Sequence, residues 1–212
     1  MIFDFEFIWQ ILPELLEGLV VTIQATVLGY LIALALGLVI AIVRRVPVIG
    51  SVVHAVMEFV RTTPLLVQLV FVFALVPPEV SPLTVGILVL GVHYAAYTAE
   101  VYRSGIEGVA KGQWEAARAL SLPYTRTWGA IVLPQAIRKV IPALGNYLIA
   151  MFKDTPLLFA ITVIELLATA QRLGAASFKV VEAYTAVGFM FLLLSIPSAI
   201  LIRRLERRYA AV

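Results

Sequence analysis

Long apolar stretches constrain this chain more than any other feature of its sequence. The stretch from Leu19 to Val43 contains no charged residue, and Arg44 and Arg45 follow directly after it. A helix needs about 20 mostly apolar residues to cross the hydrocarbon region of a bilayer. The 212-residue chain is 62% hydrophobic and 14% charged, whereas soluble domains are about 45–50% apolar and about 25% charged. The sequence therefore predicts an all-α integral membrane protein with about five transmembrane helices.

These apolar blocks are expected to form a single transmembrane domain, residues 1–212. The segment 157–170 is partly apolar, but it is too short and too interrupted by Glu165 to be predicted as a span. Pro142 and Gly145 predict a break in the fourth block, because proline lacks an amide donor. The predicted spans are at about residues 19–43, 52–76, 84–106, 134–151 and 183–202.

The positive charges indicate how the chain crosses the membrane. Arg44 and Arg45 follow the first block, and four arginines within 203–208 follow the last one. Cytoplasmic loops carry such an excess of basic residues, so five spans place the N-terminus outside and the C-terminus in the cytoplasm. This placement also argues against nucleic acid as the reason for the net charge of +3. The first fourteen residues contain no Lys or Arg, so the first helix is expected not to be a cleaved signal peptide.

The stretch 107–138 is the longest part of the chain that is too polar for a membrane, and the predicted orientation places it in the cytoplasm. Strong helix formers run from Glu115 to Leu120, and Pro123 ends this short helix. Pro134 then suits the first turn of a new helix. We therefore expect a short exposed helix between two hydrophobic blocks.

This stretch resembles the cytoplasmic coupling loop of the membrane subunits of binding-protein-dependent ABC importers. The family pattern is Glu-Ala-Ala, three residues, Gly, nine residues and Ile-x-Leu-Pro, and this chain keeps the spacing with serine at the glycine position. Segments 58–68, 100–106 and 153–155 further resemble the polar amino-acid branch of that family, which includes histidine-, glutamine- and ectoine-type permeases. The positions that match the coupling pattern are Glu115, Ala116, Ala117, Ser121, Leu133 and Pro134.

The resemblance implies a permease subunit with the type I ABC importer fold in the bacterial inner membrane. Such a subunit moves polar amino acids, or amino-acid-derived compatible solutes such as ectoine, into the cytoplasm. The implied partners are a second permease subunit, identical or different, ATPase subunits and an extracytoplasmic solute-binding protein. The chain contains no P-loop sequence, so ATP and Mg²⁺ would be used by the partner ATPase and this chain would need no cofactor. We therefore expect a lipid-embedded transporter subunit that is not itself an enzyme.

Ionisable residues within the apolar blocks are candidates for the solute pathway, because charges at membrane depth face a polar cavity or each other. Glu58 and Arg61 are three positions apart and can neutralise each other. Glu100 and Arg103 have the same spacing, and either pair could simply stabilise the fold. We expect the Asp154 carboxylate to be uncovered and to bind the ammonium of a zwitterionic solute. Arg61 or Arg103 would then bind the carboxylate of the solute. The predicted pathway residues are Asp154, Thr155, Glu100, Arg61 and Arg103.

Two other classes of membrane protein remain open from the residues alone. A secondary transporter of small zwitterions should show repeated halves, and none is evident in the sequence. A membrane-embedded enzyme would need a nucleophile with its base or a metal cluster, but the chain has two histidines and no cysteine. His93 lies in an apolar block without a second ligand-type neighbour, so we expect a packed polar residue rather than a metal ligand.

Overall fold

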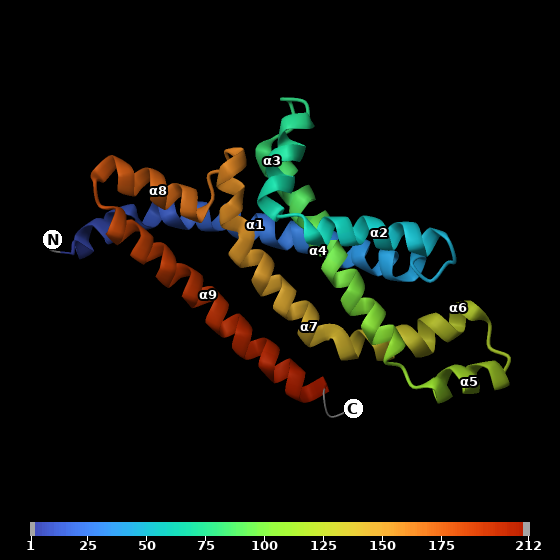
Figure 1. Cartoon of the computed structure of the whole chain (residues 1–212). Coiled ribbons are helices and arrows are strands. Elements are labelled where there is room, and N and C mark those ends of the chain that lie inside the picture. The colour runs from blue at the N-terminus through green and yellow to red at the C-terminus, as the bar shows by residue number, and fades with distance from the viewer. Residues whose placement is uncertain (1–2, 210–212) are drawn as a thin grey trace.

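The computed structural model describes residues 3–209 and shows a bundle of helices built on one long central helix (Figure 1). Residues 1–2 and 210–212 of the predicted domain lie outside the described part. Within that part, three helices are long and apolar enough to cross a membrane, or up to five if each of two bent helix pairs is one span. This agrees with the all-α architecture of about five spans predicted from the sequence.

Helix α1 (Phe5–Val43) runs along the whole molecule, and the later elements pack on it or extend from it. Element η1 is a π-helix and η2 is a 3-10 helix. The elements after α1 are α2 (Ile49–Thr62), α3 (Leu65–Leu75), α4 (Pro82–Glu107), α5 (Lys111–Ala119), α6 (Tyr124–Arg126), η1 (Thr127–Val132), α7 (Leu133–Asp154), η2 (Thr155–Ile161), α8 (Leu166–Ser177) and α9 (Val180–Tyr209).

The first helix begins well before the predicted span because Asp4 caps it. The Asp4 carboxylate accepts a hydrogen bond from the Phe7 amide at 3.0 Å, which satisfies one of the free donors at the start of a helix. It also accepts one from Lys179 Nζ at 2.6 Å, and this hydrogen bond lowers the pKa of Asp4. The N-terminal end of α1 is thereby joined to the turn between α8 and α9.

Small residues let α1 and α4 approach closely at the centre of the bundle. Gly37 of α1 is buried against α4, and a Cβ at this position would overlap Thr98 Oγ1. The Thr98 hydroxyl donates a hydrogen bond to the Ala33 carbonyl across the interface at 2.8 Å. Close approach through small residues and hydroxyl groups is typical of helix pairs in membranes.

The second predicted span is a bent pair rather than one helix. Helices α2 and α3 meet at 105°, because Pro64 has no amide hydrogen and restricts the residue before it. Gln68 Nε2 donates to the Val60 carbonyl and to Thr63 Oγ1, both at 2.7 Å. The Gln68 side chain therefore satisfies a backbone group that the proline leaves free.

A second bend lies between η2 and α8, where Glu165 is fully buried. Its carboxylate accepts hydrogen bonds from the amides of Leu167 at 2.9 Å and Ala168 at 2.7 Å. The Thr22 hydroxyl of α1 lies 3.5 Å from the same carboxylate. A carboxylate at a helix N-terminus is stabilised by free amides and the helix dipole. Glu165 thus starts α8 and holds it against α1.

The predicted break in the fourth block is wrong. Helix α7 continues through Pro142 and Gly145. Val140 and Leu144 on either side of the proline are buried, so packing offsets the lost backbone hydrogen bond. Gly145 is a packing position, since a Cβ there would lie 2.8 Å from Ile202 Cγ1 of α9.

The second helical part of the coupling stretch starts earlier than predicted. Pro134 lies in the first turn of α7 as expected, but the chain is already helical from Tyr124, and η1 leads directly into α7. The Leu133 amide donates to the Trp128 carbonyl, one residue further back than in an α-helix. Because proline cannot donate to the carbonyl four residues before it, a wider π turn forms ahead of it.

Candidate functional site

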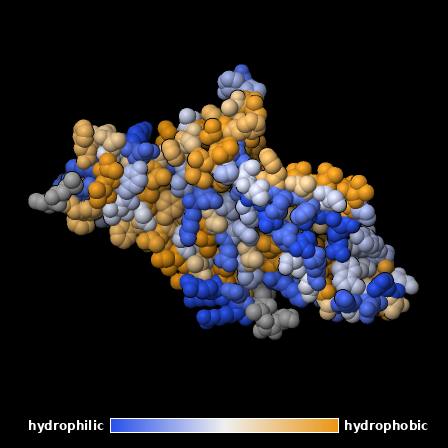
Figure 2. Space-filling model, in the orientation of Figure 1, coloured by the Kyte–Doolittle hydropathy of each residue, from blue (hydrophilic) through white to orange (hydrophobic). Residues whose placement is uncertain are grey.

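The first part of the predicted coupling stretch forms α5, a nine-residue helix at the end of the molecule opposite α8 (Figure 1). Glu115 and Ala116 are exposed, whereas Ala117 is only 2% exposed and faces inward. The half-buried Trp114 packs edge-on against Trp128 of η1, with ring centres 5.5 Å apart. We term the exposed side of residues 111–124 the coupling surface. Figure 2 shows hydrophilic residues gathered in this region and around the C-terminal end of α9.

The turn after α5 explains why the related pattern has glycine at the position of Ser121. Ser121 has a left-handed backbone with φ of 52°, a conformation that favours glycine. The Leu122 amide donates to the Ala117 carbonyl at 3.0 Å, and the Ser121 amide donates to the Arg118 carbonyl at 2.9 Å. These two bonds form a Schellman motif, which ends a helix at a left-handed residue. The exposed side chains of Leu120, before Ser121, and of Tyr124, after it, flank this turn.

A cavity of about 560 Å³ lies beside α5. Its lining contains three basic side chains and one carboxylate, that of Glu115. Within residues 3–209, Glu115 forms no ion pair or hydrogen bond with its side chain, so the carboxylate is available to an external donor. The cavity is lined by Arg45, Lys111, Trp114, Glu115, Arg118, Leu122, Tyr124 and Thr127.

The last two predicted coupling residues take different places. Pro134 is exposed near the start of α7. Leu133 is half-buried and packs on the apolar cluster that includes Ile106, Val109 and Trp128. Leu133 therefore belongs to the base on which α5 rests, while Pro134 lies at the surface.

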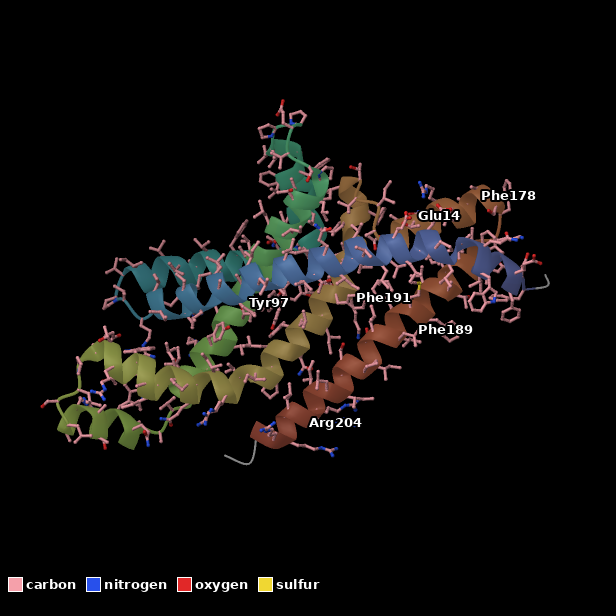
Figure 3. All side chains as sticks on the ribbon, turned by 180° about the vertical axis from the view of Figure 1, so that it is seen from behind. Glu14, Tyr97, Phe178, Phe189, Phe191 and Arg204 are labelled. Atoms are coloured by element: carbon pink, nitrogen blue, oxygen red, sulfur yellow. The ribbon has the colours of Figure 1, made fainter. Side chains whose placement is uncertain are left out.

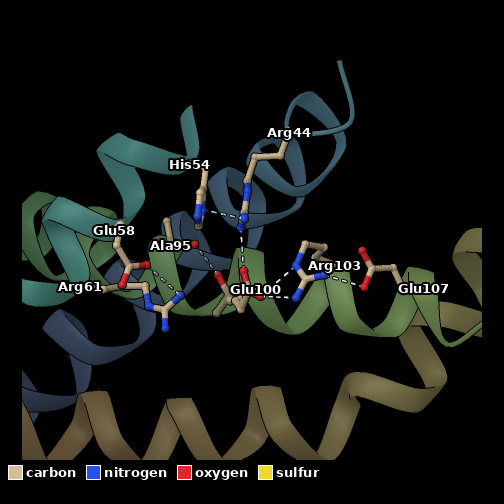
Figure 4. Close-up of polar contacts among 9 residues, drawn as sticks. Arg44, His54, Glu58, Arg61, Ala95, Glu100, Arg103 and Glu107 are labelled. Atoms are coloured by element: carbon tan, nitrogen blue, oxygen red, sulfur yellow. Dashed lines mark hydrogen bonds and ion pairs between the residues drawn. The ribbon is translucent and has the colours of Figure 1, made fainter. Parts of the chain in front are cut away.

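Glu100 is the centre of an ion-pair network between α1, α2 and α4 (Figure 4). Its carboxylate accepts hydrogen bonds from Arg44 at 2.7 Å and from Arg103 Nε at 2.8 Å. Arg103 also pairs with Glu107 at 2.5 Å, and Arg44 lies 2.8 Å from His54 Nδ1. Glu100 and Arg103 are thus engaged with structural partners, in line with the alternative that this pair stabilises the fold.

A second polar group lies where α4 passes α7. The Tyr94 hydroxyl donates to Asp154 Oδ2 at 2.7 Å, so the prediction that this carboxylate is uncovered is wrong. The rings of Tyr97 and Tyr147 have centres 5.5 Å apart, and those of Tyr94 and Tyr147 are 6.3 Å apart. We term Tyr94, Tyr97 and Tyr147 the tyrosine cluster, in which Tyr97 is labelled in Figure 3. Sequence reasoning did not assign these three tyrosines to the site.

Arg61 reaches the tyrosine cluster from α2. Its guanidinium lies 5.6 Å from the centre of the Tyr97 ring, and it pairs with Glu58 at 3.6 Å. Arg61 Nε is buried without a hydrogen-bond partner among the described residues. The structure therefore brings Arg61 and Asp154 to the same cluster, while Arg103 belongs to the Glu100 network.

Thr155 and His93 are buried beside these groups. The Thr155 hydroxyl donates to the Phe152 carbonyl at 2.7 Å, across the junction between α7 and η2. His93 Nδ1 lies 3.0 Å from Gln68 Oε1, which confirms His93 as a packed polar residue. Gln68, missed by sequence reasoning, thus connects the α2–α3 bend with α4.

Comparison with known proteins identifies relatives over nearly the whole chain. Residues 33–211 match the family described as the binding-protein-dependent transport system inner membrane component. The chain is 42% identical to a probable amino-acid ABC transporter permease protein of Sinorhizobium fredii, covering 94% of this chain and 89% of that relative. It is 33% identical to the glutamine transport system permease protein of Escherichia coli, covering 97% of both.

Solved structures show the same arrangement of helices. A crystal structure of an amino acid ABC transporter with histidines matches with a TM-score of 0.89 and 30% identity, covering 98% of this chain and 100% of that one. A methionine ABC transporter in an inward-facing conformation matches with a TM-score of 0.69 at 18% identity, covering 95% and 99%. This second likeness shows the fold alone.

The left-handed turn after α5 yields a prediction about Ser121. Ser121→Val should increase amide hydrogen exchange in α5, because a left-handed conformation costs about 1–2 kcal/mol for a residue with a Cβ and a β-branched side chain adapts poorly. Ser121→Gly should preserve or increase protection, since glycine adopts this conformation freely. Exchange measured by mass spectrometry on the purified protein checks both variants, and equal protection in the two would contradict the left-handed turn.

Proposed function

We propose that this chain forms the membrane pathway of an importer for polar amino acids. The chain belongs to the family of inner membrane components of binding-protein-dependent transport systems. The chain is an ABC transporter permease subunit, a transporter component rather than an enzyme. The relatives are named for amino acids, which supports this substrate class over the ectoine-type solutes considered from the sequence. The observation that carries the proposal is the coupling surface, an exposed polar helix held outside the apolar bundle by a fixed turn.

The coupling surface is proposed to dock onto an ATPase subunit, which would use the ATP and Mg²⁺. Glu115 offers a carboxylate that has no partner among residues 3–209, and charge-assisted hydrogen bonds to Arg or Lys are among the stronger ones. The exposed Ala116 permits close approach of the partner. The remaining coupling residues would support this surface: Ala117 and Leu133 by packing beneath α5, Ser121 by ending the helix, and Pro134 at the start of α7.

Replacement of Glu115 tests the docking role. Glu115→Lys should lower the amount of ATPase that co-purifies at least about tenfold, because repulsion between like charges at a contact costs several kcal/mol. Glu79→Lys, an equally exposed site in the turn between α3 and α4, makes the same charge change away from the coupling surface and should leave co-purification unchanged. Normal ATPase binding and ATP-driven uptake by Glu115→Lys would refute docking at this residue. Uptake without any ATPase would instead indicate a secondary transporter.

The tyrosine cluster is proposed to line the solute pathway. Asp154 would meet the ammonium group of the amino acid, and tyrosine rings also attract cations. Arg61, whose Nε lacks a described partner, would meet the solute carboxylate. Glu100, Arg103 and Thr155 were considered for the same role, but their described hydrogen bonds favour a structural one.

Asp154→Asn tests this pathway because it removes the charge and keeps the side-chain shape. Uptake by the assembled transporter should fall at least about tenfold. The variant loses the attraction between the Asp154 carboxylate and the solute ammonium, which at low dielectric is worth more than about 1.4 kcal/mol. ATPase assembly and basal hydrolysis should persist. Glu79→Gln is the matched control, since it neutralises an exposed carboxylate in the turn between α3 and α4 and should leave uptake unchanged. Unchanged uptake by Asp154→Asn would place the pathway elsewhere, and failed assembly would make Asp154 a structural residue.

The arginine clusters support a multi-pass orientation with the N-terminus outside and the C-terminus in the cytoplasm. Single cysteines report on this directly, because the chain has none of its own. Cysteine in place of Lys111 or Arg207 should react with a membrane-impermeant thiol reagent only in inverted vesicles or opened cells. Cysteine in place of Glu79 should react in intact cells, in which the outer surface of the inner membrane is reached by the reagent. Labelling of position 111 from outside would invert the orientation.

A further inference from the structure

We propose that Arg45 is a positioning residue that fastens the coupling surface to the end of α1. Arg45 lies two residues after Val43, the last residue of α1. Its guanidinium carbon lies 5.2 Å from the ring centre of Trp128 and 5.6 Å from that of Trp114. We term Arg45, Trp114 and Trp128 the arginine clamp. This inference rests on the proposed docking of α5, and it assigns a role to a residue outside the coupling pattern.

The arginine clamp joins three elements that are far apart in the sequence. Arg45 comes from the turn after α1, Trp114 from α5 and Trp128 from η1. The two tryptophan rings are nearly perpendicular, at 78°, and the guanidinium lies within about 6 Å of both centres, the range in which cations are attracted to aromatic rings. Tryptophan is the aromatic residue that attracts a cation most strongly. The clamp therefore links the central membrane helix directly to the coupling helix.

Arg45 and Arg44 have different partners although they are adjacent. Arg44 is held by Glu100 and His54. Within residues 3–209 the Arg45 side chain forms no ion pair or hydrogen bond. Its charge is instead placed against the two tryptophan rings. The indole nitrogen of the buried Trp128 likewise has no hydrogen-bond partner among the described residues. The ring is thus held by packing and by the cation rather than by a hydrogen bond.

The turn that carries Arg45 is tightly packed against its own backbone. In the turn after it, Val48 has a left-handed φ of 68°, and a Cβ on Gly50 would overlap the Arg44 carbonyl. Helix α5 itself rests on η1, next to the Trp114–Trp128 contact. A movement of the docked α5 would therefore displace Arg45 and the end of α1. Loss of the clamp should loosen α5 and weaken the link between ATP hydrolysis and transport without removing the docking residues.

A spin label on α5 measures the clamp separately from docking. Cysteine in place of Gly112 suits the label, since a Cβ there meets no atom within 4 Å and the chain has no native cysteine. In the full chain in lipid nanodiscs without ATPase subunits, Arg45→Met should increase label mobility. In the assembled, unlabelled transporter it should reduce the ratio of solute-stimulated to basal ATPase about threefold to tenfold. Arg45→Lys should retain most of both, because an ammonium still binds aromatic rings. Arg126→Met is the matched control, as Arg126 is exposed and lies outside the clamp.

A double-mutant cycle shows whether Arg45 acts through the tryptophan. Adding Arg45→Met to Trp114→Leu should change label mobility less than Arg45→Met does in the unmodified background. Additive effects, or unchanged mobility and ATPase ratio in Arg45→Met, would overturn the proposal. If Arg45→Met fails to assemble, Arg45→Gln takes its place with the same expected outcomes, because it also removes the cation that contacts the rings. The docking proposal is tested separately by Glu115→Lys and is refuted if that variant retains normal ATPase binding. The mobility measurement still tests the clamp in that case.

Discussion

The requirement that backbone polar groups find partners away from water shapes the whole bundle. Lipid offers no hydrogen bonds, so a break in a membrane helix must be satisfied by protein groups. At the α2–α3 bend Gln68 supplies the donor to Val60 and Thr63. Before α8, the Glu165 carboxylate accepts from two free amides. Each of these two bends thus depends on one polar side chain, and these side chains set where the two helix pairs change direction.

Helix α4 combines two polar systems that serve different ends of the molecule. Toward its C-terminus, Glu100 and Arg103 are held in the network with α1 and α2. One to two turns earlier, Tyr94 and Tyr97 face Asp154 and Arg61. Because both systems are on one helix that packs along α1, the charges that anchor the bundle also fix the position of the tyrosine cluster. The position of the proposed solute pathway is therefore linked to the ion pairs of the bundle through α4.

Features with a local signature could be predicted from the sequence, and features built from distant residues could not. The short helix at Glu115 and the ion pair of Glu100 with Arg103 follow from spacing along a helix. Tyr94 and Asp154 are separated by 60 positions, and a tyrosine in an apolar block gives no local signal of its partner. The continuity of α7 through Pro142 was missed for the same reason, because the packing that offsets the proline comes from other helices. The role of Ser121 needed the backbone angle as well as the spacing.

The contact between Thr22 and Glu165 has a consequence for biosynthesis. The two residues are 143 positions apart, and chains are made and inserted from the N-terminus onward. Helix α1 is therefore complete long before the segment that will occupy its surface has left the ribosome. During that interval the Thr22 hydroxyl can remain bonded to the Gly18 carbonyl of its own helix at 3.2 Å, which makes α1 self-sufficient in lipid. The buried carboxylate joins a helix that is already in place, so α8 is fitted onto the bundle late in translation.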